Sequence, residues 1–318
     1  KHLEGGGQFV DDLVLSRMVN VAFLRSPFAH AQIVSINFEE AKECPGIIDI
    51  FTANEIDEIC KPWVGTLGHL GEMKSPEQTP LAKSVARWQG EAIAVVIAKT
   101  REQAEDALEL IEVEWLEKEA QVDMETALND DAVIIHEELG SNLFWTRTVE
   151  QGNVENAFKE AVTVVKTSLD FARHTGVTLE SRGIVADWNK AEEKMTVYHN
   201  GQAPHMMQHI IAKHFNVNEG LVRIVSRDVG GSFGIKVHVY PDEMAAVAVS
   251  KKIGRPVKFI ADRLESFTTD IHARCHKISG KLAVNKDGKI TAMEVNDLSG
   301  IGPFSMYPRT SAIETNQV

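Results

Sequence analysis

Short apolar blocks divide the first third of the chain and predict a small α/β unit. Residues 92–98 are continuously apolar, which is typical of a strand buried on both faces. Thr100 and Gln103 follow at the spacing of a helix cap, so a helix is expected over residues 101–110. Apolar and acidic residues then alternate over residues 111–115, as in a half-buried strand. Two earlier strands are expected at residues 19–24 and 47–51.

The second half predicts strands and helices that do not alternate regularly. A helix beginning at Pro204 has its apolar residues spaced for one buried face. The best-marked helix begins at Pro241, carries Asp242 and Glu243 in its first turn, and ends before Gly254. Strands are expected at residues 164–171, 184–188, 195–198 and 221–225, and a short helix capped by Asn153 at residues 154–161. The turn at residues 285–288 predicts a hairpin between strands 278–284 and 290–297. Such a mixture indicates an α+β fold.

Length and composition indicate a folded protein of two domains. The 318 residues are about twice a common domain, and the acidic, irregular stretch 121–140 is the expected connector. We therefore predict domains at residues 1–125 and 126–318. The net charge of −13 argues against a nucleic-acid or anionic-lipid surface. No apolar run is long enough to span a membrane.

The cysteine pattern indicates a reducing compartment. Cys44, Cys60 and Cys275 lie far apart, which excludes an iron–sulfur ligand set or a disulfide framework built from this chain. The first residues contain neither an initiator Met nor an apolar signal core, so the true start is expected upstream and secretion is not expected. A cytoplasmic location is therefore expected.

The most informative stretch for chemistry is a glycine-rich loop. Gly230, Gly231 and Gly234 allow positive φ angles and expose amide donors to a polar ligand, although a plain turn before the next helix explains the same pattern. The spacing is neither Walker A nor G-x-G-x-x-G. Gln202 lies between a strand and the Pro204 helix, and the next strand leads into the loop. We therefore expect Gln202 and the loop to meet at neighbouring strand ends.

Two alternative sites are present in the sequence. The stretch GGSFG matches G-x-S-x-G and makes Ser232 a candidate hydrolase nucleophile. Its partners would be Asp262 or Asp270 and then His272 or His276. That motif needs a helix directly after the serine, whereas residues 235–240 alternate like a strand. His205 and His209 have the spacing of metal ligands, but Met206 stands where H-E-x-x-H needs its glutamate. No metal ligand is assigned.

Several motifs, taken in order, resemble one known family. Residues 7–15, 23–33, 45–56 and 87–115 resemble the α/β hammerhead domain of the large, molybdopterin-binding subunit of xanthine dehydrogenase, aldehyde oxidase and carbon monoxide dehydrogenase. Residues 173–188, the Gln202 turn, the glycine-rich loop, residues 254–267 and residues 307–318 resemble its first molybdenum-cofactor-binding domain. The resemblance runs along the whole chain. It implies a hammerhead domain followed by the first cofactor-binding domain.

The resemblance also implies a site. The family's glutamine and glycine loop contact the molybdenum cofactor, and the matching residues here are Gln202, Gly230, Gly231, Ser232, Phe233 and Gly234. Ser232 stands where many members have a third glycine, which questions that glycine's conformation here. Val237 stands where purine-oxidising members carry a glutamate, so the loop is similar to that of carbon monoxide dehydrogenase-type subunits.

The activity implied by the resemblance is that of a molybdenum hydroxylase, an oxidoreductase. Such an enzyme oxidises or hydroxylates an aldehyde, a heterocycle or a similar small molecule with water as the oxygen source. Family subunits are much longer, so the second molybdopterin domain and the general base are expected on another segment or chain. A hetero-oligomer with [2Fe–2S] and FAD subunits is expected, since this chain cannot hold the clusters. The cytosine dinucleotide form of the cofactor stays open. Two other functions also stay open: a serine hydrolase, and an assembly subunit that binds no cofactor.

Overall fold

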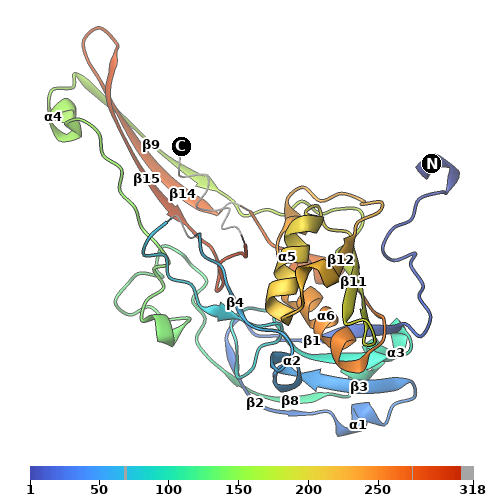
Figure 1. Cartoon of the computed structure of the whole chain (residues 1–318). Coiled ribbons are helices and arrows are strands. Elements are labelled where there is room, and N and C mark those ends of the chain that lie inside the picture. The colour runs from blue at the N-terminus through green and yellow to red at the C-terminus, as the bar shows by residue number, and fades with distance from the viewer. Residues whose placement is uncertain (68–69, 274, 309–318) are drawn as a thin grey trace. The chain divides into compact units, whose positions relative to one another are not determined.

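The computed structural model describes residues 1–67, 70–273 and 275–308, so the last part of the motif at 307–318 lies outside the described residues. The fold is α+β, as predicted (Figure 1). The chain forms two compact units, and each contains several separate segments. The first unit comprises residues 1–65, 77–120 and 176–271, and the second comprises residues 66–76, 121–175 and 272–318. The division at residue 125 concerns sequence domains and stays a prediction.

A seven-stranded mixed sheet forms the centre of the first unit. Its strands, in spatial order, are β12 (Val222–Val225), β11 (Lys194–His199), β10 (Gly183–Asn189), β13 (Val257–Ile260), β1 (Val19–Arg25), β7 (Ala92–Ala98) and β3 (Ile47–Thr52). The pairs β1–β13 and β11–β12 are parallel, and the other pairs are antiparallel. The sheet therefore joins strands from both halves of the sequence.

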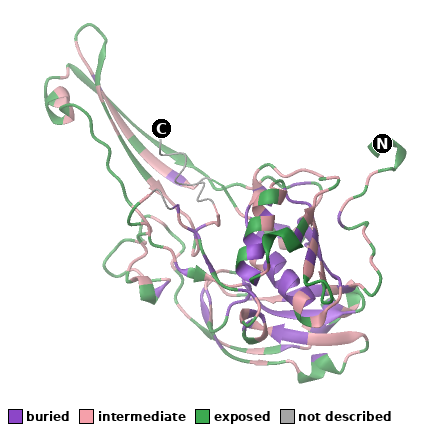
Figure 2. Ribbon diagram, in the orientation of Figure 1, coloured by how far each residue is buried: buried purple, intermediate pink, exposed green. Residues whose placement is uncertain are grey.

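Helices pack on this sheet and bury its apolar residues. α6 (Pro241–Ile253) contacts β10 and β13, and every residue from Asp242 to Ser250 is buried. α5 (Pro204–Phe215) contacts β12, and α3 (Arg101–Leu108) contacts β1 and β7. Thr100 accepts a hydrogen bond from the Gln103 amide at 3.3 Å, which confirms the predicted cap of α3. The buried residues gather in α6 and the sheet strands (Figure 2).

Smaller elements complete the first unit. A three-stranded sheet has the order β6 (Val85–Ala86), β2 (Ala31–Asn37) and β8 (Glu112–Glu117), and β4 (Trp63–Val64) pairs with β5 (Glu77–Gln78). The short helices are η1 (His2–Glu4), α1 (Glu39–Lys42), α2 (Ala53–Asp57), η3 (Glu219–Leu221) and α7 (Arg263–Thr269). Among the described residues, no helix is long and apolar enough to cross a bilayer.

The second unit contains an exposed antiparallel sheet. β14 (His276–Val284) pairs with β15 (Ile290–Ser299) and with β9 (Thr163–Phe171), and the three strands extend as a long ribbon (Figure 1). The Gly288 amide donates to the Asn285 carbonyl at 3.0 Å, which confirms the predicted hairpin turn. Asn153 caps α4 (Val154–Lys159), as predicted, and η2 (Glu137–Leu139) lies in the irregular segment.

The strand expected at residues 235–240 is wrong. The segment begins with a 3₁₀ turn, η4 (Ile235–Val237), whose first amide donates to the Ser232 carbonyl at 2.9 Å. Lys236 and His238, two polar residues of the alternating pattern, are both buried. Alternation failed as a strand signal because these polar side chains have partners inside the protein.

Candidate functional site

The glycine loop, defined as residues 230–234, lies between β12 and α6, and its backbone needs two kinds of glycine. Gly231 and Gly234 have φ angles of 101° and 90°, in the region that favours glycine. Gly230 is needed for close approach, because a Cβ there would lie 2.4 Å from the Cβ of Glu180. Ser232 has no positive φ, so a serine fits without strain; the residue at positive φ is Phe233, at 51°.

Gln202 and the glycine loop meet, as the order of strands predicted. The Gln202 Oε1 atom accepts a hydrogen bond from the Gly234 amide at 3.2 Å and another from the Ser232 hydroxyl. The Gln202 backbone N–H donates to the Lys236 backbone carbonyl at 3.0 Å. The side chain therefore holds the middle of the loop through its oxygen and keeps its NH₂ group as a donor.

A second contact fixes the ends of the loop, and the sequence analysis missed it. The Glu180 Oε2 atom accepts from the Gly230 amide at 2.7 Å and from Lys236 Nζ at 3.0 Å. Burial lowers the pKa of Lys236, and the nearby Glu180 carboxylate acts against that shift. The signal available in the sequence was Lys236, a charged residue within the largely apolar stretch 235–240, which indicates a buried partner.

Three consecutive amides of the loop have no hydrogen-bond acceptor among the described residues. Within the described part of the chain, no group accepts a hydrogen bond from the amides of Gly231, Ser232 or Phe233. The Glu180 Oε1 atom is buried and likewise has no partner there. Adjacent free amides bind oxygen-rich, polar groups, and a buried carboxylate oxygen accepts from a ligand N–H. This donor and acceptor set fits a pterin cofactor.

A buried charge network lies at the start of α6. Arg182 is fully buried and donates to Asp270 at 2.6 Å, to Asp242 at 2.9 Å and to Glu243 at 3.2 Å. The guanidinium carbon lies 3.6 Å from the centre of the Tyr240 ring. Asp242 and Glu243 thus begin the helix, as predicted, and also pair with Arg182. Sequence reasoning did not identify this network, because its members are far apart along the chain.

The network shifts the acidity of its members. Burial alone raises the pKa of Asp242, but Arg182 and Arg25 outweigh it and lower the value to about 2. Burial raises the pKa of Asp270 in spite of Arg182. Burial also raises the pKa of Tyr240, whose hydroxyl donates to the Ile235 carbonyl at 2.9 Å. Asp242 therefore stays ionised beside Arg182 at neutral pH, and the network supports the backbone at the start of α6.

The hydrolase candidate lacks its machinery. Ser232 donates its hydroxyl hydrogen to Gln202 and accepts from the Lys236 amide, and a 3₁₀ turn follows it instead of a helix. Asp262 caps α7 through the Glu265 amide at 2.7 Å, while Asp270 pairs with Arg182. His276 Nδ1 lies 3.0 Å from Asp297 and 2.6 Å from Ser299, and its Nε2 lies 3.5 Å from the same serine, so the recorded side-chain partners of His276 are Asp297 and Ser299.

The histidine candidates do not converge. His205 and His209 are exposed, and His209 Nδ1 lies 3.2 Å from Glu219 Oε2. Among the described residues, no three His, Cys, Asp or Glu side chains are grouped as metal ligands.

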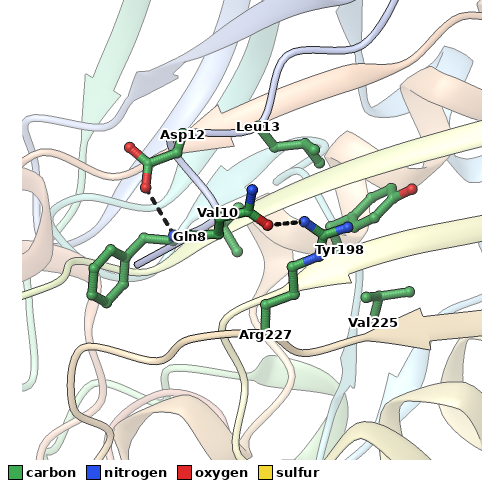
Figure 3. A pocket seen from close by; sticks show the side chains of 8 residues that line it. Gln8, Val10, Asp12, Leu13, Tyr198, Val225 and Arg227 are labelled. Atoms are coloured by element: carbon green, nitrogen blue, oxygen red, sulfur yellow. Dashed lines mark hydrogen bonds between the residues drawn. The ribbon is translucent and has the colours of Figure 1, made fainter. Parts of the chain in front are cut away.

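Two hollows lie near the site. A cavity of about 60 Å³ is enclosed by the N-terminal segment and the ends of β11 and β12, where Arg227 donates to Gln8 (Figure 3). It is too small for a cofactor. A more open hollow of about 290 Å³ lies between the first turn of α5 and β12, beside the Gln202 turn. Its lining residues include Pro204, His205, Gln208, Arg223 and Ser226.

Comparison with known proteins identifies both halves of the chain. Residues 135–316 match the family model of the molybdopterin cofactor-binding domain, and residues 4–119 match the aldehyde oxidase and xanthine dehydrogenase a/b hammerhead domain. The matches follow the order of domains that the resemblance implied. Neither alternative function, the hydrolase or the cofactor-free assembly subunit, gains support from them.

Individual relatives agree with these models. The chain is 31% identical to the carbon monoxide dehydrogenase large chain of Hydrogenophaga pseudoflava over 96% of its own length and 39% of the relative's. It is 30% identical to the nicotine 6-hydroxylase large subunit of Paenarthrobacter nicotinovorans, covering 98% of this chain and 38% of that subunit. The crystal structure of quinoline 2-oxidoreductase from Pseudomonas putida 86 superposes with a TM-score of 0.92 at 33% identity, covering 96% of this chain and 39% of that one. The chain thus spans about two fifths of the length of these proteins.

Proposed function

The chain belongs to the family of molybdopterin-binding large subunits of xanthine dehydrogenase, aldehyde oxidase and carbon monoxide dehydrogenase, and from this premise we propose that it forms part of the cofactor site of a molybdenum hydroxylase. The proposed contacts are Gln202, Gly230, Gly231, Ser232, Phe233 and Gly234.

The open amides of the glycine loop carry this proposal. Gly231, Ser232 and Phe233 present adjacent N–H donors, and the structure beside them is held by Gln202 and Glu180. Donors that are already oriented bind a polar ligand without a further ordering cost. A loop that served only as a turn would have no need for donors held open between two fixed points.

In the proposed enzyme the chain's residues bind and orient. The loop amides hold oxygen atoms of the cofactor, and the Gln202 NH₂ group donates to a further acceptor. The bound molybdenum cofactor supplies the redox chemistry of the reaction, with water as the oxygen source. The Arg182 network keeps charged groups paired beside the loop and so limits their competition for the ligand.

The proposed substrate class is an aldehyde, an aromatic heterocycle or a similar small molecule, and two of the relatives above are named for heterocycles, nicotine and quinoline. The proposed partners are a segment or chain with the second molybdopterin domain, an iron–sulfur subunit and an FAD subunit. All three cysteines are free, which agrees with a cytoplasmic location for the proposed complex.

Molybdenum content tests the proposal directly. We would purify the native complex through this chain and measure molybdenum and iron per chain by elemental mass spectrometry. About one molybdenum per chain is the expected result. A complex that includes the second molybdopterin domain but holds no molybdenum would refute the assignment.

Variants test the role of Gln202. Gln202→Ala should lower molybdenum content and turnover on the order of tenfold while the melting temperature changes little, since Gln202 is exposed. Gln121→Ala is the matched control, because Gln121 is half-buried outside the site and, among the described residues, its Nε2 donates to nearby groups, the Asp123 carbonyl and the Thr126 hydroxyl. Equal molybdenum content in the Gln202 variant and the control would remove Gln202 from the site.

A further inference from the structure

A single carboxylate oxygen contacts the start of the glycine loop and a lysine that follows the loop. Glu180 Oε2 lies 2.7 Å from the amide nitrogen of Gly230, the first loop residue, and 3.0 Å from Nζ of Lys236, two residues beyond the last. The Glu180 amide also donates to the Gly230 carbonyl at 3.2 Å. Glu180 thus joins the start of the loop to the segment that follows it.

Lys236 is an unusual residue for this position. Its side chain is 1% exposed, and a buried ammonium group is costly unless it is paired. An apolar side chain of similar length would fill the same space without that cost. The ion pair adds what an apolar contact lacks, which is a directed bond that fixes where the loop ends.

Glu180 is itself held firmly. Arg263, the first residue of α7, donates to the Thr178 carbonyl at 2.6 Å and to the Leu179 carbonyl at 2.9 Å. The Thr178 hydroxyl donates to the Glu180 carbonyl at 2.6 Å. The backbone that carries the Glu180 carboxylate is therefore held by hydrogen bonds, and the carboxylate can fix the position of the loop residues that it contacts.

We propose that Glu180 and Lys236 are positioning residues, which hold the ends of the glycine loop so that its open amides can receive the cofactor. Gln202 holds the middle of the loop, and the Glu180–Lys236 pair sets the distance between its ends. The inference rests on the proposed function and extends it to two residues outside the motif.

The test uses the native complex with four variants of this chain: Glu180→Gln, Lys236→Met, the double variant, and Glu294→Gln as control. Glu294 pairs with Lys281 at 2.7 Å on the exposed β14–β15 hairpin, so the control removes a carboxylate–lysine pair of the same chemistry. Three quantities are measured: the melting temperature, hydrogen–deuterium exchange of peptides covering residues 228–237, and molybdenum per chain.

Each single variant should speed exchange in the loop and lower molybdenum per chain on the order of tenfold, as loss of outer partners does at metal sites. The double variant leaves no unpaired buried charge, so its melting temperature should return toward that of the wild type. Its molybdenum content should stay low, because the directed bond is still missing. If the single variants fail to assemble, the molybdenum content and melting temperature of the double variant test the inference.

Two results would overturn the inference. One is wild-type molybdenum content in the variants, and the other is molybdenum that recovers together with the melting temperature in the double variant, which would mark a purely structural pair. In both cases a molybdenum-loaded wild type leaves the proposed function standing. A wild-type complex without molybdenum would remove the function and the inference together.

Discussion

Replacing Arg182 by Met should loosen the start of α6 more than any surface change. The guanidinium is fully buried and contacts the carboxylates of Asp242, Glu243 and Asp270. Methionine retains much of the apolar stem but removes the charge. Asp242 would then keep Arg25, which also pairs with Glu265, and Glu243 would keep His199 at 3.0 Å, whereas Asp270 would lose its ion pair.

The size of the effect follows from the charges. Arg182 and Arg25 overcome the effect of burial and lower the pKa of Asp242 from 3.8 to about 2, which corresponds to about 2 kcal/mol of native stability. Because the native pKa is lowered, that stability is complete above pH 3.8 and is lost as the pH falls through about 2. Removing one partner of a buried pair costs about 3–5 kcal/mol in total. We take about 3 kcal/mol as the expected loss at neutral pH.

Hydrogen–deuterium exchange of α6 in the native complex measures this loss. A change of about 3 kcal/mol corresponds to roughly a hundredfold faster exchange of the α6 amides at pH 7. Arg101→Met is the control, because Arg101 forms an exposed pair with Glu105 that is worth about 0.5 kcal/mol or less. Exchange within about threefold of the wild type in Arg182→Met would refute the view that Arg182 fixes this helix end.

Two further predictions concern Gly230 and Glu91. Gly230→Ala would place a Cβ 2.4 Å from the Cβ of Glu180, so the loop must shift, and molybdenum per chain should fall on the order of tenfold. Gly71→Ala is the control, because a Cβ there would have nothing within 4 Å among the described residues, and it should leave the molybdenum content unchanged. Burial raises the pKa of Glu91 from 4.5 to about 7, so this residue makes stability fall as the pH rises between those values, by about 3 kcal/mol. In melting curves from pH 5 to 8, Glu91→Gln should lack this decline, and an equal decline in both proteins would contradict the reasoning.

Local signals in the sequence predicted most of the elements. The apolar run 92–98, the Thr100 cap, Pro241 at its helix start and the turn at residues 285–288 all depend on residues close together in the chain. The helix cap and the turn make their hydrogen bonds within the segment or with adjacent residues, whereas the strand 92–98 is marked by its apolar run and pairs with the distant strands β1 and β3. The motif order likewise indicated the family and drew attention to Gln202 and the glycine loop.

The wrong strand prediction at residues 235–240 shows the limit of predicting structure from neighbouring residues alone. Lys236 belongs to the alternating pattern, but its partner Glu180 lies 56 positions earlier in the chain, and the lysine is buried beside it. A polar residue is assigned to the surface unless a partner is known, and the partner here is brought near only by the fold.

The sequence by itself determined the element types, the family and the residue types of the site. Only the tertiary structure decided that Gln202 holds the loop through its oxygen, that Glu180 joins the two loop ends, and that Arg182 gathers carboxylates from α6 and the end of α7. The physical reason is that these contacts depend on distances of a few ångströms between segments far apart in the chain. Burial then decides their strength, because a charge removed from water needs its partner at bonding distance.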